Sequence, residues 1–166
     1  MKKLVIVACL AAAGCGEDTP TGPTTTNAVF NVALSAANEV PPISNAEAGA
    51  TGTATITLTI TRDTAGTITA ATVDFSVTLA NFPAGSVARL AHIHTAAAGV
   101  TGAVLVDTGL SPSAAVAMPN GTGSFSFTGV AISPENATAV LLNPAGYYFN
   151  VHSVLNPSGV VRGQLR

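Results

Sequence analysis

Residues 53–62 place the strongest constraint on the fold, because apolar side chains alternate there with threonines at every position. The apolar members of this alternation are Ala54, Ile56, Leu58 and Ile60. Successive side chains of a strand point to opposite faces of a sheet, so the alternation predicts a half-buried β-strand. A chain with such a strand must supply partner strands and a second apolar layer, because one amphipathic strand cannot bury its own face.

Further strand-like segments follow along the chain, separated by turns rich in glycine, proline and asparagine. Strands are expected at residues 28–36, 68–79, 87–95, 103–107, 122–130, 147–153 and 160–165. The apolar parity of residues 68–79 switches part-way, which one extra residue near Ala71 and Thr72 explains as a β-bulge. Near residue 133, a serine followed by proline and glutamate predicts the start of one short helix that ends before Asn143.

About eight short strands, little helix and regular turns predict an all-β fold. We expect an antiparallel β-sandwich with Greek-key connections and one short helix. Leu58, Phe75 and Phe127 lie on apolar strand faces, so we place them at the centre of the core. No cysteine follows Cys15, so this core must be stable without disulfides.

The N-terminal segment has the composition of an export signal and a linker. Two lysines precede a ten-residue apolar run, which leads through small residues to Gly14 and Cys15. This layout is typical of a secretory signal peptide, and its end resembles a bacterial lipoprotein signal, in which the cysteine becomes the lipidated first residue. We therefore expect residues 1–14 to be a lipoprotein signal peptide, residues 15–27 to be the lipidated Cys15 and a disordered tether, and residues 28–166 to be the folded domain. An ordinary cleaved signal with an incidental cysteine is the alternative.

This N-terminal segment predicts where the protein resides and which classes of partner it meets. The protein is expected to be secreted across the inner membrane and lipid-anchored in the bacterial cell envelope, at the outer membrane or cell surface. Loss of the two signal-peptide lysines from six basic residues leaves four arginines against eight acids, a net charge of about −4. Such a lysine-free, weakly acidic surface argues against nucleic acid or anionic lipid as a partner. The expected partners are the membrane, through the lipid anchor, and an unidentified protein or envelope ligand.

All three histidines fall in two of the predicted strands. His92 and His94 are two residues apart and share one strand face, and His152 shares a face with Tyr148 and Asn150. One hypothesis is that the histidines form a site for one Zn or Cu ion, because neutral imidazoles are common ligands of both.

The other hypothesis, which we favour from the sequence, makes the histidines members of a hydrogen-bonded structural cluster. Its further members are Glu39, Asn150, Arg162 and Gln164. Buried polar groups need partners, and Arg162 offers a fork of donors to Glu39 or to backbone carbonyls. Such a cluster would join the first segment of the domain to the last hairpin. No nucleophile motif, phosphate-binding loop or dinucleotide fingerprint occurs, so we expect no enzymatic activity.

Five short motifs occur in a characteristic order along the domain. They lie at residues 34–42, 49–54, 91–94, 146–153 and 159–165. Together they resemble the CHRD domain, first described in chordin, over residues 28–166. The resemblance implies an immunoglobulin-like or superoxide-dismutase-like β-sandwich and no established activity.

These features lead to an expected function and two alternatives. We expect a membrane-anchored, non-enzymatic binding or structural module of the cell envelope. The first alternative is a protein that binds Cu or Zn with the three histidines. The less favoured second alternative is a superoxide-dismutase-like oxidoreductase: the doublet His92 and His94 is similar to one in copper–zinc superoxide dismutase, but three histidines are too few for a bridged pair of metals.

Overall fold

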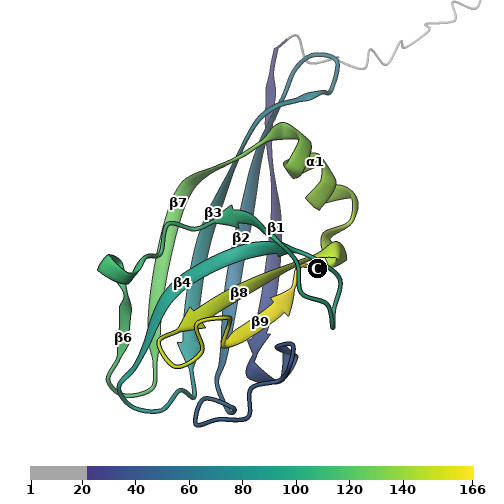
Figure 1. Cartoon of the computed structure of the whole chain (residues 1–166). Helices are drawn as coiled ribbons and strands as arrows, with labels where there is room; N and C mark the ends of the chain where they lie inside the picture. The colour runs from purple at the N-terminus through teal and green to yellow at the C-terminus, as the bar shows by residue number, and fades with distance from the viewer. Residues whose placement is uncertain (1–21) are drawn as a thin grey trace, which may run out of the picture.

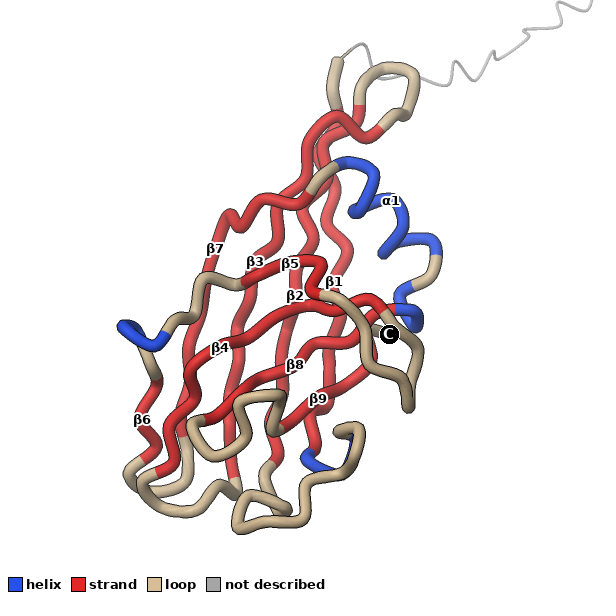
Figure 2. The backbone as a smooth tube through the Cα atoms, in the orientation of Figure 1, coloured by secondary structure: helices blue, strands red, loops and turns tan. Residues whose placement is uncertain are grey.

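The computed structural model describes residues 22–166, and the expected signal peptide and Cys15 lie outside the described residues. Residues 22–166 form nine antiparallel strands and one α-helix, α1 (Pro134–Leu142) (Figures 1 and 2). The strands are β1 (Thr24–Ser35), β2 (Thr51–Arg62), β3 (Ile68–Ala80), β4 (Ser86–Thr95), β5 (Val104–Asp107), β6 (Val116–Met118), β7 (Gly123–Ile132), β8 (Tyr147–Ser153) and β9 (Val161–Gln164). The predicted all-β, antiparallel fold is confirmed.

The strands form one continuous sheet that folds back on itself into two layers. Their order is β5-β4-β8-β9-β1-β2-β3-β7, and β6 adds to β4. One layer contains β1, β2, β3 and β7, and the other contains β9, β8, β4 and β5 (Figure 1). A single residue pair, Ser35 with Arg162, joins the two layers between β1 and β9. The last hairpin therefore lies beside the first strand, although the chain between them makes the rest of the fold.

Three strand features differ from the sequence expectation. The first strand begins at Thr24, inside the segment expected to be tether. The bulge in β3 lies at Thr69, because Thr61 pairs with Ala70 while Arg62 pairs with Ile68. The short strand β6 occupies a segment expected to be irregular. It is extended because it pairs with β4, and its own sequence contains no strand pattern that predicts this pairing.

The core lies between the two layers and confirms two of the three predicted central residues. Leu58 and Phe75 are buried, and the Phe75 ring stacks on Phe149 of the opposite layer with ring centroids 5.7 Å apart. Phe127 is only half-buried, so its predicted central place is wrong. The reason is that β7 is an edge strand, and an edge strand is covered on fewer sides than a central one.

The predicted helix is present with its predicted start. The Ser133 hydroxyl accepts a hydrogen bond from the Asn136 backbone N–H at 3.1 Å, which satisfies one of the unpaired donors of the first turn. Ala137 and Val140 of α1 are buried against the core, and the helix ends at Leu142 as expected. Among residues 22–166, the structure contains no helix of the length and apolar character needed to cross a membrane.

Candidate metal centre

The three histidines lie on the outer face of the layer that contains β4 and β8. These two strands pair so that His94 is opposite Tyr148 and His92 is opposite Asn150, while His152 is opposite Leu90. The residues that alternate with them, which include Ile93 and Phe149, are buried in the core between the layers. Strand parity thus predicts the face correctly, and the neighbouring position of β8 beside β4 brings the three rings together.

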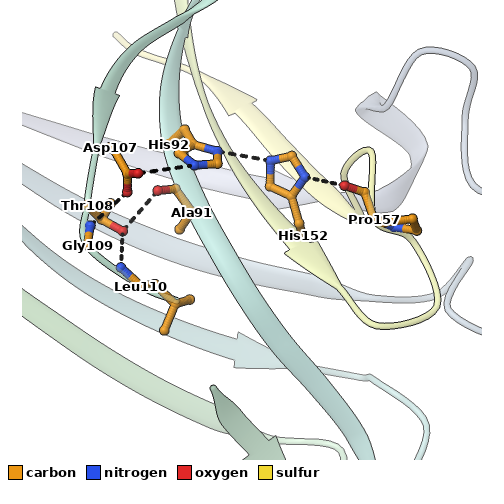
Figure 3. Close-up of polar contacts among 8 residues, drawn as sticks. All are labelled: Ala91, His92, Asp107, Thr108, Gly109, Leu110, His152 and Pro157. Atoms are coloured by element: carbon orange, nitrogen blue, oxygen red, sulfur yellow. Dashed lines mark hydrogen bonds and ion pairs between the residues drawn. The ribbon is translucent and has the colours of Figure 1, made fainter. Parts of the chain in front are cut away.

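The three rings are close enough to share one ligand. Each offers a nitrogen atom, and these three atoms all lie within 4.8 Å of one another. His92 Nδ1 is 3.1 Å from His152 Nε2 (Figure 3). The His92 ring centroid is 5.5 Å from that of His94. All three side chains are buried, with 8–9 % of each residue exposed.

Backbone carbonyls determine where two of the rings carry their protons. His94 Nδ1 lies 3.0 Å from the carbonyl oxygen of Gly102, and His152 Nδ1 lies 2.9 Å from that of Pro157. A carbonyl oxygen can only accept, so Nδ1 must be the protonated nitrogen of both rings. In the neutral form, each ring then has a lone pair on Nε2. The Nε2 atom of His94 is buried and has no hydrogen-bond partner among the described residues.

The third ring is oriented by a carboxylate. His92 Nε2 lies 3.8 Å from Asp107 Oδ2 on the neighbouring strand β5 (Figure 3). Because His152 Nε2 carries a lone pair, the 3.1 Å contact makes His92 Nδ1 its hydrogen-bond donor. Coordination by His92 Nδ1 requires the other tautomer, in which the proton is on Nε2 and faces Asp107. In that tautomer, three nitrogen lone pairs would face one another within 4.8 Å, an arrangement that a bound cation would stabilise. An oxygen acceptor that orients the outer nitrogen of a ligand histidine is the usual arrangement around protein metal sites.

The electrostatic surroundings keep the rings neutral. Burial lowers the pKa of His92, His94 and His152, because the charged form loses its hydration, and the neighbouring His152 lowers the pKa of His92 further. The contact of His94 with the Gly102 carbonyl raises the pKa of His94 but only partly offsets the burial. Neutral imidazole is the form that coordinates a metal ion, so the rings are ready to bind at neutral pH.

Two glycines allow the covering loops to approach this face. A Cβ atom at Gly102 would overlap the carbonyl oxygen of Thr95, so only glycine lets the loop after β4 return closely enough to contact His94. Gly159 has a φ of 133°, and a Cβ atom there would lie 2.7 Å from Asn150 Nδ2 and 3.0 Å from Glu39 Oε1. Glycine at these positions is a sequence signal for close backbone approach that could have located the covering loops.

The predicted structural cluster is assembled only in part. Asn150 Nδ2 donates to Glu39 Oε1 at 3.1 Å, which joins the segment after β1 to β8. Arg162 donates to backbone carbonyls instead of Glu39: Nε to Asn38 at 2.7 Å and Nη1 to Val100 at 3.1 Å. Its guanidinium also lies 4.3 Å from the ring centroid of Tyr148.

The side chain of Gln164 donates hydrogen bonds to two other loops and not to Glu39. Its Nε2 donates to the carbonyls of Ala96 at 2.7 Å and Ala145 at 2.8 Å, because the residue lies opposite Tyr148, at the other end of the β8–β9 ladder from the turn. Gln164 therefore makes none of its side-chain hydrogen bonds to Glu39, Asn150 or Arg162, the other members of the predicted cluster. The register of the β8–β9 pairing decides which groups Gln164 contacts, and no local sequence pattern determines that register.

Sequence reasoning missed two acidic residues. Asp107 ends an unremarkable four-residue strand, and only its pairing with His92 shows its role. Glu47 is buried and accepts hydrogen bonds from Ser153 Oγ at 2.5 Å and Asn156 Nδ2 at 2.6 Å, which holds the loop after β8 in place. No signal in the sequence singles out either acid.

Glu39 provides a test of how this face responds to pH. Burial raises the pKa of Glu39 to about 7, although the nearby Arg162 and the hydrogen bond from Asn150 lower it in part. From about pH 4.5 to 7 the folded protein then binds more protons at this residue than the unfolded chain, so this group makes stability fall as pH rises. We expect Glu39→Gln to gain stability relative to the wild type over that interval, by up to about 3 kcal/mol.

Denaturant unfolding of both proteins at several pH values measures this difference. The Gln side chain keeps an oxygen for Asn150, so the hydrogen bond is retained in the comparison. Glu135→Gln is the control, because it is the same chemical change at an exposed position of α1. A stability difference between Glu39→Gln and wild type that stays constant from pH 4.5 to 7 would contradict the raised pKa.

Comparison with known proteins identifies one family. A model of the CHRD domain matches residues 30–165, almost the whole of the described chain. No curated protein and no solved structure matches the chain.

Proposed function

The chain belongs to the CHRD domain family, and on that premise we propose that it is a non-enzymatic module that holds one zinc or copper ion with His92, His94 and His152. The observation that carries the proposal is the convergence of three ring nitrogens within 4.8 Å, each on a ring whose other nitrogen lies near an oxygen atom. This arrangement fits a metal ion better than the purely structural cluster, which leaves His94 Nε2 without a partner.

The spacing of the nitrogens supports a single ion. Metal–nitrogen bonds of ~2.0–2.1 Å at tetrahedral angles separate the ligand nitrogens by about 3.3 Å. The His92 and His152 nitrogens are already 3.1 Å apart, and the widest separation among the three atoms, within 4.8 Å, closes by a small side-chain movement. Imidazole suits both zinc and copper, and the three-nitrogen set does not choose between them.

Titration of metal-free protein tests this proposal. Isothermal titration with Zn²⁺ and, separately, Cu²⁺ should give saturable binding of one ion per chain at pH 7.5. Elemental mass spectrometry of the dialysed complex should give the same ratio. Absence of saturable binding by either ion would refute the metal site and leave the histidines as a structural cluster.

We propose in addition that the module is tethered to a membrane of the cell envelope through lipid on Cys15. The support is the sequence: a short apolar run ends in small residues and Gly14 directly before Cys15. The first strand begins at Thr24, so only residues 16–23 separate the lipidated cysteine from the sheet. A linker of that length reaches at most about 30 Å, which keeps the module close to the membrane surface.

Replacing Cys15 with alanine tests the anchor. The variant should move from the membrane fraction to the soluble fraction of the cell, because a protein without lipid has no apolar group to insert. Fractionation with an antibody against the folded domain measures the distribution, and Cys9→Ala is the matched control that should remain in the membrane. A Cys15→Ala protein that stays in the membrane with unchanged processing would contradict the lipoprotein assignment.

A further inference from the structure

A cavity of about 570 Å³ lies at the seam where β9 meets β1, and none of the histidines lines it. Its wall comes from β1, from the segment after β1, from the loop after β4 and from β9. The lining residues that matter for its chemistry are Ala33, Glu39, Val40, Ala98 and Arg162. Cavities of ~300–1,000 Å³ are typical of sites for small organic ligands.

Two arginines line this cavity, the exposed Arg166 and the buried Arg162, and the buried one is incompletely paired. Arg162 is 2 % exposed, and two of its nitrogens donate to the carbonyls of Asn38 and Val100. Its third nitrogen, Nη2, is buried and has no hydrogen-bond partner among the described residues. Within residues 22–166, no carboxylate lies within ion-pair distance of this guanidinium. Buried charges are normally paired, so the positive charge of Arg162 lacks the anion that would balance it.

Glu39 does not fill that role, although it shares the cavity wall. Its carboxyl group contacts Asn150 Nδ2 and makes no ion pair with Arg162. Burial also raises the pKa of Glu39 to about 7, so near neutral pH the group is protonated in a large fraction of molecules. A negative charge supplied from outside the chain is therefore the missing component.

We propose that this cavity binds a small organic acid, a monocarboxylate with an aliphatic body, and that its carboxylate pairs with Arg162. Arginine and carboxylate form short, charge-assisted hydrogen bonds, and one negative charge balances the buried positive charge of Arg162. The exposed Arg166 is a second cation that lines the cavity. Ala33, Val40 and Ala98 give the cavity aliphatic walls that suit a hydrocarbon chain. This proposal is independent of the metal site, since no histidine takes part.

The test uses metal-free full-length protein, with butyrate and hexanoate as probes. Titration followed by protein NMR should show saturable binding of both acids, at least about 10-fold tighter than that of 1-butanol and 1-hexanol. Inorganic phosphate should bind at least about 10-fold more weakly than hexanoate, because it has no apolar body. Alcohols that bind as tightly as the acids, or phosphate that binds as tightly as hexanoate, would overturn the proposal.

Two variants locate the binding. Arg162→Gln should weaken hexanoate binding more than 10-fold, but Arg162 also joins two loops and its loss can unfold the face. Ala98→Phe avoids this problem, because residue 98 is exposed, lines the cavity and accepts no hydrogen bond from Arg162. It should weaken hexanoate binding more than 10-fold at an unchanged Tm. Ala131→Phe, on the exposed side of β7, is the matched control and should bind normally. Unchanged hexanoate affinity in Ala98→Phe would overturn the assignment of the cavity.

Discussion

Replacing Phe75 with alanine is expected to lower the free energy of unfolding by about 3–5 kcal/mol. Phe75 is 1 % exposed, pairs with Ile56 on β2 and stacks on Phe149 of the opposite layer. The substitution removes this aromatic contact between the layers and leaves a cavity that the surrounding strands can only partly close. Urea unfolding at neutral pH, with the m-value checked for constancy, measures the loss.

Phe127 provides the matched control for this prediction. It lies directly opposite Phe75 in the β3–β7 ladder and undergoes the same chemical change, but β7 is an edge strand and the side chain is only partly buried. Phe127→Ala should therefore cost only about 1–2 kcal/mol. Equal losses for the two variants would mean that burial between the layers is not what stabilises Phe75, and a loss below ~1 kcal/mol for Phe75→Ala would contradict its place in the core.

The second large effect is expected from replacing His152 with alanine, which should weaken Zn²⁺ or Cu²⁺ binding by more than about 100-fold. The reason is that the substitution removes one of three ligand nitrogens. Loss of a residue that only hydrogen-bonds to a ligand typically lowers metal affinity about 10–100-fold. In the wild type, free metal at 100 times its Kd should add about 2.7 kcal/mol to the free energy of unfolding. In His152→Ala the same free metal concentration should add less than about 0.4 kcal/mol. Calorimetric titration measures the affinity, and thermal unfolding measures the stabilisation.

Two control variants separate coordination from general damage to this face. Asp107→Asn keeps all three histidines and should weaken metal binding only about 10-fold, since Asp107 orients His92 from a side chain that is 62 % exposed. Tyr148→Phe keeps the ring that stacks on His94, with centroids 4.9 Å apart, and removes only a hydroxyl that accepts from the Gly102 N–H at 3.3 Å, so it should weaken metal binding far less than His152→Ala does. Wild-type metal affinity in His152→Ala would exclude His152 from the site. An equal loss in Tyr148→Phe would show that the effect is not coordination.

Local patterns in the sequence predict most of the secondary structure of this protein. The alternation of threonine with Ile56 and Leu58 identifies a strand and its buried face, because side chains of an extended chain change sides at every residue. The serine and proline at 133 and 134 locate the start of the helix, because capping is satisfied within one turn. The same parity rule places His92 and His94 on one face, and the ordered motifs identify the family.

The tertiary structure alone decides what those faces meet. His152 reaches His92 because β8 pairs with β4 across sixty residues of sequence, and strand order is a property of the whole sheet. Asp107 becomes an acceptor for His92 through the β4–β5 register, while Arg162 finds carbonyls instead of Glu39 because two loops close over β9. Side-chain parity has a period of two residues and determines only the side of the sheet. Which atoms lie opposite one another depends on register and on loop closure, and these are settled by packing contacts between segments distant in the chain.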